Sequence, residues 1–359
     1  MAKKSVIPFG PQHPVLPEPI QLDLVLEDET VVDAIPSIGF IHRGLESLVT
    51  KKDFNEMVYV VERTCGICSF MHGMGYCEAV EHVMNIDIPV RAKYLRMLWA
   101  EMSRVHSHLL WLGLYADAFG FEALFYQSWR YREKVLDMFE KSTGGRCIFS
   151  VNKVGGVLKD ISTDMLASFK TRFADLEKDV RVLAKTFLND LTVNKRLRGT
   201  GILTKEKALE MGAVGPFLRG SGVHLDLRES GYLAYRDIDF EVITAEEGDN
   251  YARTKVRIEE IFQSLSIIRQ CIEKMPDSPL SVPVKGNPDG EYAMRLEQPR
   301  GEAVYYVKAN GTKYLDRVRL RTPTFANIAP MVSILKGAKL ADVPLYVHSI
   351  DPCISCTER

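Results

Sequence analysis

Apolar residues recur at three- and four-residue steps in four long stretches of this chain. That spacing places them on one face of an α-helix. Pro89 suits the first turn of the first helix, because proline lacks an amide hydrogen that the first turn leaves unbonded. Four amphipathic helices of this length favour a bundle whose apolar faces form the core. The four stretches are residues 89–112, 121–139, 166–187 and 258–275.

Short stretches near both ends of the chain are typical of β-strands. Leucines alternate with other residues over 22–26, and two valines follow at 31–32, so we expect an antiparallel pair there. Towards the other end, residues 303–307 and 314–320 flank Asn310-Gly311. An Asn-Gly step between two strand-like runs is a strong signal for a β-hairpin.

These patterns predict an α+β protein that is mainly helical, with a central bundle of long helices and small antiparallel sheets at its periphery. No repeat, low-complexity segment or linker divides the chain, so we expect one compact unit over residues 1–359. It would comprise an N-terminal β region (about 1–50), a helical core (about 53–275) and a C-terminal hairpin and tail (about 295–359).

The composition is that of an ordinary soluble globular protein. Of 359 residues, 46% are hydrophobic and 26% are charged, and the formal net charge is −1. This balance argues against nucleic acid as the main partner. No apolar run reaches the length of about 18 residues that a membrane span needs, so we do not expect the chain itself to cross a membrane. The basic start from Met1 to Ser5 lacks the apolar segment of a secretory signal.

Four of the seven cysteines form two C-x-x-C pairs, Cys65 with Cys68 and Cys353 with Cys356. Two such pairs supply four soft sulfur ligands for zinc, an iron–sulfur cluster or another soft transition metal. A structural zinc site is the first interpretation of such pairs in an arbitrary chain. However, the pairs lie 353 − 68 = 285 residues apart, whereas compact zinc modules take their ligands from nearby. The other three cysteines are expected to be reduced, structural thiols: Cys77, Cys147 and Cys271.

The residues around the pairs form the motifs R-x-C-G-x-C-x-x-x-H, which ends at His72, and D-P-C-x-x-C, which begins at Asp351. Together they resemble the large, catalytic subunit of [NiFe]-hydrogenases. In that family four cysteines hold a nickel–iron centre with one carbon monoxide and two cyanide ligands on the iron. The resemblance implies that His72 donates a hydrogen bond to a bridging sulfur. It also implies terminal nickel ligands, Cys65 and Cys353, and ligands that bridge nickel and iron, Cys68 and Cys356.

Further motifs extend the resemblance to the surroundings of the centre. Pro299-Arg300-Gly301 matches a P-R-G motif whose arginine lies over the nickel–iron centre and contacts a cyanide, which implies this place for Pro299 and Arg300. Asp351 is implied as the carboxylate neighbour of Arg300, and Thr324 as a hydrogen-bond partner of the other cyanide. A fixed cation in a dry pocket would orient or polarise the substrate, because its field is strong there.

Residues 10–14 (G-P-Q-H-P) resemble a motif of energy-converting, membrane-bound (Ech-like, group 4) hydrogenases and of the 49 kDa quinone-site subunit of respiratory complex I. In the hydrogenases a glutamate near this motif passes protons to a nickel-bound cysteine. The resemblance implies Glu18 for that relay, with Cys353 as a thiolate base. A solvated surface carboxylate is the equal alternative for Glu18.

Residues 42–46 (H-R-G-L-E) match a second motif of both relatives. In many hydrogenases its glutamate helps to hold a magnesium ion together with a C-terminal histidine. The last residue here is Arg359. We therefore expect either a magnesium site at Glu46 or an Arg359–Glu46 ion pair in its place.

The resemblance implies the fold shared by hydrogenase large subunits and the complex I 49 kDa subunit, and the reaction H2 = 2 H⁺ + 2 e⁻. No further cysteine set in the chain suits an iron–sulfur cluster. The resemblance implies that electrons pass through a small partner subunit with a [4Fe–4S] cluster, to or from ferredoxin or a ferredoxin-type subunit. Integral membrane subunits would couple the reaction to ion translocation, with this chain peripheral on the cytoplasmic face of the cell membrane.

Two other functions stay open. The quinone-site subunit of complex I shares most of these motifs, including Glu101 and Arg104, which we expect to form a buried ion pair, but it lacks the metal-binding cysteines. A non-catalytic scaffold with a four-cysteine zinc site would explain the cysteines. It would not explain His72, Pro299-Arg300 and Asp351-Pro352 together.

Overall fold

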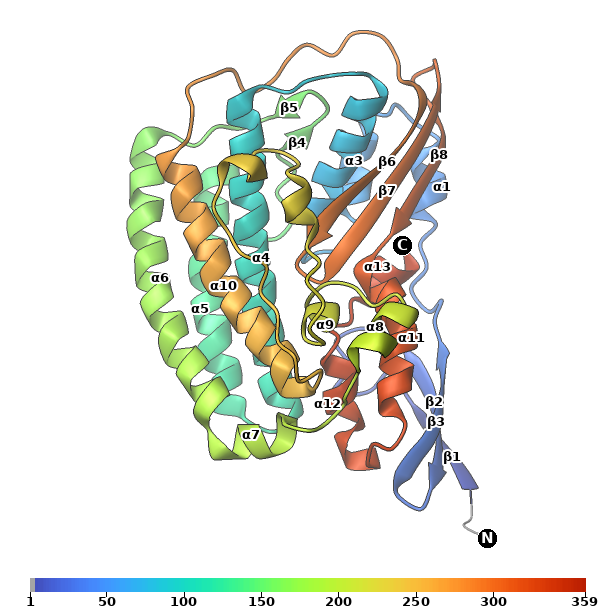
Figure 1. Cartoon of the computed structure of the whole chain (residues 1–359). Helices are drawn as coiled ribbons and strands as arrows, with labels where there is room; N and C mark the ends of the chain where they lie inside the picture. The colour runs from blue at the N-terminus through green and yellow to red at the C-terminus, as the bar shows by residue number, and fades with distance from the viewer. Residues whose placement is uncertain (1–3) are drawn as a thin grey trace.

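Four long helices pack side by side and form one half of the molecule, as seen in a computed structural model that describes residues 4–359 (Figure 1). The bundle predicted from the apolar spacing is confirmed. The second and fourth of these helices in chain order both pack against the first, which carries buried residues on every side. The four helices are α4 (Val90–Ala118), α5 (Glu122–Thr143), α6 (Thr163–Asn189) and α10 (Asn250–Glu273).

Side-chain N-caps set the starts of α6 and α10. The Ser162 side chain accepts a hydrogen bond from the Met165 amide at the start of α6, and Asp249 accepts one from Ala252 at the start of α10. Such N-caps satisfy amides that the first helical turn leaves without a partner. Helix α10 therefore begins eight residues before its predicted apolar stripe, because the cap and not the stripe sets its start.

The first peripheral sheet has the order β1-β2-β3, with all neighbours antiparallel. Strands β2 (Gln21–Glu27) and β3 (Thr30–Ser37) were predicted, but β1 (Lys4–Phe9) was not. All residues of β1 except Phe9 are exposed, so it has no apolar face of its own to reveal it. Its pairing with β2 forms the strand.

The second sheet consists of β6 (Asp289–Gln298), β7 (Gly301–Asn310) and β8 (Leu315–Arg321), again antiparallel in that order. The predicted hairpin is β7 with β8, whereas β6 was not expected because its first five residues are exposed. Pro299 and Arg300 form the turn between β6 and β7, since Gln298 pairs with Gly301 across the ladder. Arg300 is thus held at the closed end of a hairpin.

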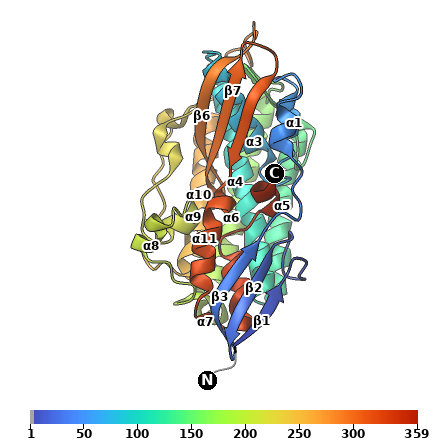
Figure 2. The same cartoon turned by 90° about the vertical axis from the view of Figure 1, so that its right-hand side faces the viewer.

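The two sheets lie one above the other along one side of the molecule, with the C-terminus between them (Figure 2). One hydrophobic core lies in the bundle and under the second sheet, and another joins the first sheet to the last helices. Within residues 4–359 no helix combines the length and apolar content that crossing a bilayer requires. The remaining elements are α1 (Leu45–Val49), α2 (Met57–Glu62), α3 (Ser69–Val83), β4 (Asn152–Lys153), β5 (Gly156–Val157), α7 (Leu191–Leu197), α8 (Lys205–Glu210), α9 (Pro216–Arg219), η1 (Leu227–Ser230), η2 (Tyr235–Asp237), α11 (Pro323–Leu335), η3 (Leu340–Asp342), α12 (Val343–His348) and α13 (Ile354–Glu358).

Candidate metal centre

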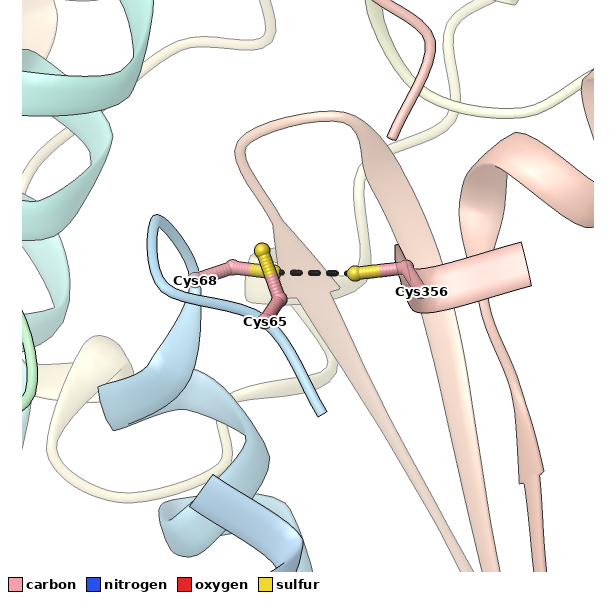
Figure 3. Close-up of side chains that lie close together, drawn as sticks. All are labelled: Cys65, Cys68 and Cys356. Atoms are coloured by element: carbon pink, nitrogen blue, oxygen red, sulfur yellow. Dashed lines mark hydrogen bonds between the residues drawn. The ribbon is translucent and has the colours of Figure 1, made fainter. Parts of the chain in front are cut away.

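The two cysteine pairs meet in the interior. The Cys65 and Cys353 sulfurs lie 3.3 Å apart, the Cys68 and Cys356 sulfurs 3.2 Å apart, and all four residues are buried. Figure 3 shows Cys65, Cys68 and Cys356 pointing toward one another. Their sulfurs all lie within 4.8 Å of one another. The structure therefore brings together all four cysteines that the sequence predicts as ligands.

The first pair lies in a loop that leads into α3, whereas Cys353 precedes α13 and Cys356 lies within that helix. Cys68 is the N-cap of α3 and Cys353 the N-cap of α13. The Ile67 amide donates to the Cys65 sulfur over 3.2 Å, which turns this side chain inward. Hydrogen bonds from Cys353, Cys356 and Cys65 lower the pKa of Cys68, whereas burial raises the pKa of Cys356. Four buried sulfurs thus ionise together only when cations compensate their charge, which fits a metal-binding donor set.

His72 is oriented by two residues of the second sheet. Gln298 Nε2 donates to the Tyr305 hydroxyl over 2.7 Å, and that hydroxyl lies 2.9 Å from His72 Nδ1. The hydroxyl therefore donates to Nδ1, and the hydrogen of a neutral His72 resides on Nε2. Nε2 lies 3.4 Å from the Cys68 sulfur and 3.3 Å from the Cys356 sulfur, so it can donate to both.

Tyr305 was not predicted from the sequence. It reaches His72 because Gly75 of α3 leaves room for it: a Cβ at position 75 would lie 2.4 Å from the Tyr305 ring. The only local sequence signal for this contact is Gly75, one turn after the metal-ligand motif. A glycine does not indicate which residue will pack against it.

Arg300 is buried and held by three hydrogen bonds. Its Nε donates to the Asp351 carbonyl over 2.9 Å, Nη2 donates to Asp351 Oδ1 over 2.8 Å, and Nη1 donates to Ser107 Oγ over 3.3 Å. Burial lowers the pKa of Arg300, but Asp351 and Cys353 together raise it well above the ordinary value. Arg300 is therefore a fixed, permanent cation beside the cysteines. The predicted pair with Asp351 is present, and Ser107 is an addition.

The start of α11 holds the second cysteine pair. The Cys353 amide donates to Thr324 Oγ1 over 3.1 Å, and Thr322 Oγ1 donates to the Cys356 carbonyl over 3.0 Å. Thr324 thus accepts a hydrogen bond from the ligand loop, while its own hydroxyl hydrogen stays available for the predicted cofactor contact. Pro299, buried in the turn before Arg300, makes no hydrogen bond through its nitrogen.

Glu18 reaches the same loop from the N-terminal segment. Its carboxylate accepts hydrogen bonds from the amides of Ile354 and Ser355 and from the Ser355 hydroxyl. It is partly buried and lies beside the residues that follow Cys353. A solvated surface carboxylate does not describe this position.

The segment from Gly39 to Glu46 holds the terminal residues in place. Glu358 accepts from the Gly39 amide over 2.6 Å and from the Ile41 amide over 2.5 Å. Arg359 donates to Glu46 over 2.8 Å, so the ion pair expected as one alternative is present. The magnesium ion at Glu46 stays a prediction.

A buried charge network lies behind the site. Glu101 of α4 lies 3.3 Å from Arg104, as expected, and 3.3 Å from Arg228. It also accepts hydrogen bonds from Tyr235 over 2.5 Å and from Ser264 over 2.6 Å. Burial alone would raise the pKa of Glu101, but the two arginines lower it, so the carboxylate stays charged.

Comparison with known proteins assigns the family. The model described as the 49 kDa subunit of respiratory-chain NADH dehydrogenase matches residues 118–286 and 283–359. The model described as nickel-dependent hydrogenase matches residues 43–116, which include the first cysteine pair and His72.

Curated relatives cover nearly the whole chain. The carbon monoxide-induced hydrogenase of Rhodospirillum rubrum is 37% identical over 98% of this chain and 99% of its own length. The membrane-bound hydrogenase subunit alpha of Pyrococcus furiosus is 37% identical over 98% of this chain and 87% of its own length. An NADH-quinone oxidoreductase subunit of Chloroherpeton thalassium is 32% identical over 100% of this chain and 88% of its own length.

The chain therefore belongs to the family that unites nickel-dependent hydrogenases with the 49 kDa subunit of respiratory-chain NADH dehydrogenase. Within that family, the resemblance to the large subunit of energy-converting, membrane-bound [NiFe]-hydrogenases and the fold it implied are confirmed. Both branches are oxidoreductases by name. The choice between their activities depends on the site.

Proposed function

We propose that this chain is the catalytic subunit of a [NiFe]-hydrogenase, which interconverts H2 with protons and electrons. The convergence of four buried cysteine sulfurs on one point carries this proposal. Quinone reduction needs no such donor set, whereas nickel and iron in low oxidation states favour soft thiolate ligands.

The donor set fits the nickel–iron centre. Cys65 and Cys353 would be the terminal nickel ligands, and Cys68 and Cys356 would bridge nickel and an iron that carries one carbon monoxide and two cyanides. When bound, this centre supplies the heterolytic cleavage and formation of H2. The charged Arg300 and the hydroxyl of Thr324 would bind the cyanides.

The chain's own residues would set the field and the hydrogen bonds around the ligands. Arg300 keeps a positive charge in a water-excluded site, because Asp351 and Ser107 hold its guanidinium in one orientation. His72 would donate from Nε2 to a bridging sulfur, with its tautomer set by Tyr305. Neither group has to reorganise during the reaction.

A proton would leave through Cys353 and Glu18. The Cys353 thiolate would accept it, because a thiolate ligand is a base at the centre itself. Glu18 would receive it next, because its carboxylate already contacts the two residues after Cys353.

Electrons would need a partner. In the described part of the chain, the cysteine cluster is the only group of three or more potential metal ligands close enough to share an ion. A small subunit with a [4Fe–4S] cluster would pass electrons to or from ferredoxin or a ferredoxin-type subunit. By analogy with the relative named as membrane-bound, integral membrane subunits would couple the reaction to ion translocation, with this chain on the cytoplasmic face.

Infrared spectroscopy of the anaerobically purified complex, with nickel and iron analysis of the same sample, tests the proposal. We expect one carbon monoxide and two cyanide stretching bands, with nickel and iron near one atom each per chain. Zinc in place of nickel, without these bands, would support a zinc scaffold. No metal and no bands, together with quinone-dependent electron transfer, would support the complex I-like alternative.

A further inference from the structure

We propose that buried polar groups along α3, with Glu62 and Glu78 as the protonatable members, carry protons between the cysteine loop and a surface cavity. This route would be separate from Glu18, which approaches the site from the N-terminal segment. The inference rests on the proposed function, because only a reaction that makes or consumes protons at the cysteines requires a route.

Glu62 forms the inner end of the row. It ends α2, three residues before Cys65, and is only 1% exposed. One carboxylate oxygen accepts from Ser150 Oγ over 2.6 Å, while the other, Oε1, has no hydrogen-bond partner among residues 4–359. Oε1 lies over Gly73, the residue after His72, where a Cβ would lie only 2.5 Å away. The glycine therefore admits this carboxylate to the surface of α3.

The same face of α3 continues away from the cysteines. Gly73, Cys77 and Glu81 recur at four-residue steps, so they lie above one another on the helix. At about 1.5 Å per residue, the row from position 73 to position 81 spans roughly 12 Å. Burial raises the pKa of the Cys77 thiol, Arg96 opposes this, and the charges of Glu81, Glu62 and Glu78 raise it further.

Glu78, the residue after Cys77, lies beside this row and connects it to the surface. It lines a cavity of about 640 Å³ with His82, Lys93 and Tyr292 among the other lining residues. Glu78 is 6% exposed, and in the described residues its Oε1 has no partner. Neighbouring Glu81, by contrast, is held by Arg96 through two hydrogen bonds of 2.8 and 2.7 Å. Asp87, which also lines the cavity, pairs with Lys93 over 2.6 Å, so Glu78 is the lining carboxyl group that has no ion-pair partner within residues 4–359.

Other polar atoms near this row also lack partners within residues 4–359. Buried polar atoms of this kind are normally satisfied by internal water molecules, which make two to four hydrogen bonds each. Hydrogen-bonded water between carboxyl groups passes protons across gaps that side chains alone do not bridge. Besides Glu62 Oε1 and Glu78 Oε1, the unpartnered atoms are Thr64 Oγ1, Asn152 Oδ1 and Arg96 Nε.

Both carboxyl groups are suited to exchange protons near neutral pH. Burial raises the pKa of Glu62 to about 7, although Ser150, Arg63 and Asn152 lower it. Burial also raises the pKa of Glu78 to about 8; Arg96 and Lys93 oppose this and Glu81 adds to it. The other titratable residues around the cavity are His82, Asp87, Tyr232, Arg236, Tyr292 and Arg295.

The first test does not depend on catalysis. Infrared difference spectra of the intact complex, recorded from about pH 5 to about pH 10, report the protonation of buried carboxyl groups. We expect that Glu62→Gln and Glu78→Gln each remove one titrating carboxyl band and that both bands shift in D2O. The proposal is wrong if neither variant removes a titrating band, or if the bands do not shift in D2O.

The second test measures turnover in the same complexes. We expect both variants to lower H2 turnover by about 100-fold, with the carbon monoxide and cyanide bands and the melting temperature unchanged. Exposed Glu56 of the α2 N-cap gives the control variant Glu56→Gln, which should keep full activity. Should Glu62→Gln fail to fold, Glu78→Gln and Glu62→Asp carry the test.

Turnover within about twofold of the wild type in correctly loaded variants would overturn the route. A wild-type complex without the metal-ligand bands and without H2 turnover would instead refute the proposed function. In that case the carboxyl titration still reports whether the row binds and exchanges protons, so the two failures are distinguishable.

Discussion

At the scale of single residues, the site depends on groups whose charge and orientation are fixed. Arg300 combines burial with three hydrogen bonds to Asp351 and Ser107. Lysine would keep the charge but lacks the planar fork that binds Asp351 through two atoms. The contribution of Arg300 would therefore come from its geometry as well as from its charge.

We predict that Arg300→Lys lowers H2 turnover by about 100-fold or more while nickel and iron are retained, since preorganised charge is lost and ligands are not. Activity assays with metal analysis measure this. Arg317→Lys on the exposed face of β8 is the matched control and should be silent. Loss of metal in Arg300→Lys would show a structural role instead.

Glu62 and Glu78 also affect stability. Their pKa values in the folded chain, about 7 and about 8, lie above the ordinary value of 4.5. Between the ordinary value of 4.5 and each raised pKa, the folded state binds more protons than the unfolded state, so the free energy of unfolding falls as pH rises. The slope is about 1.4 kcal/mol per pH unit for each group within its range.

We therefore predict that Glu62→Gln and Glu78→Gln each flatten the decline in the free energy of unfolding between about pH 5 and about pH 8. Denaturant unfolding at a series of pH values measures this slope. A slope unchanged in both variants would contradict the raised pKa values.

Sequence motifs predicted the site residues that can be recognised from residue type and spacing alone. The cysteines, His72, Arg300 and Asp351 lie close together, as expected. Tyr305, Ser107 and Thr322 were missed because a buried hydroxyl has no sequence signature for its partner. Their partners lie on other elements of the chain, which only the tertiary packing brings close.

At the scale of elements, apolar spacing predicted the long helices, and the Asn310-Gly311 step between two strand-like runs predicted the β7–β8 hairpin. Strands β1 and β6 were not predicted, and the reason is the same for both. Most of β1 and the first half of β6 are exposed, so their stability comes from ladder hydrogen bonds to β2 and β7. Pairing energy of this kind is not visible in a single strand's sequence.

The contact between Glu18 and the start of α13 leads to a prediction about this element. Glu18→Gln keeps a carbonyl oxygen for the amides of Ile354 and Ser355 but accepts no proton. We expect H2 turnover to fall by about 100-fold with nickel retained. Glu18→Ala should also lower the nickel content, because both amides lose their acceptor.

Metal analysis and amide hydrogen exchange at positions 354 and 355 separate these effects. Glu29→Gln, in the exposed turn between β2 and β3, is the control. Full activity of Glu18→Gln would exclude Glu18 from proton transfer and leave it a capping residue.

At the scale of the whole molecule, the charge network joins elements from distant parts of the chain. Arg219 of α9 lies 2.7 Å from Glu260 of α10 and 2.8 Å from Glu297 of β6. Glu260 also lies 2.9 Å from His108 of α4, which holds the bundle and the second sheet in one register. Removing one member leaves its partners charged and buried.

We predict that Glu101→Gln destabilises the chain by about 3–5 kcal/mol, because buried Arg104 loses its counter-charge and Arg228 keeps only Asp226. Denaturant unfolding of the purified chain measures the change. Asp175→Asn breaks an exposed pair with Lys178 and should have no measurable effect. An equally small change in Glu101→Gln would show that water reaches the network.

The four cysteines pack as a small cluster of their own, apart from both hydrophobic cores. For the history of the family, this means that the ligands and the architecture can be inherited separately. A lineage that exchanged these four side chains would keep the bundle, both sheets and the charge network. An NADH-quinone oxidoreductase chain aligns with 100% of this sequence, so the two branches of the family share the architecture across its whole length.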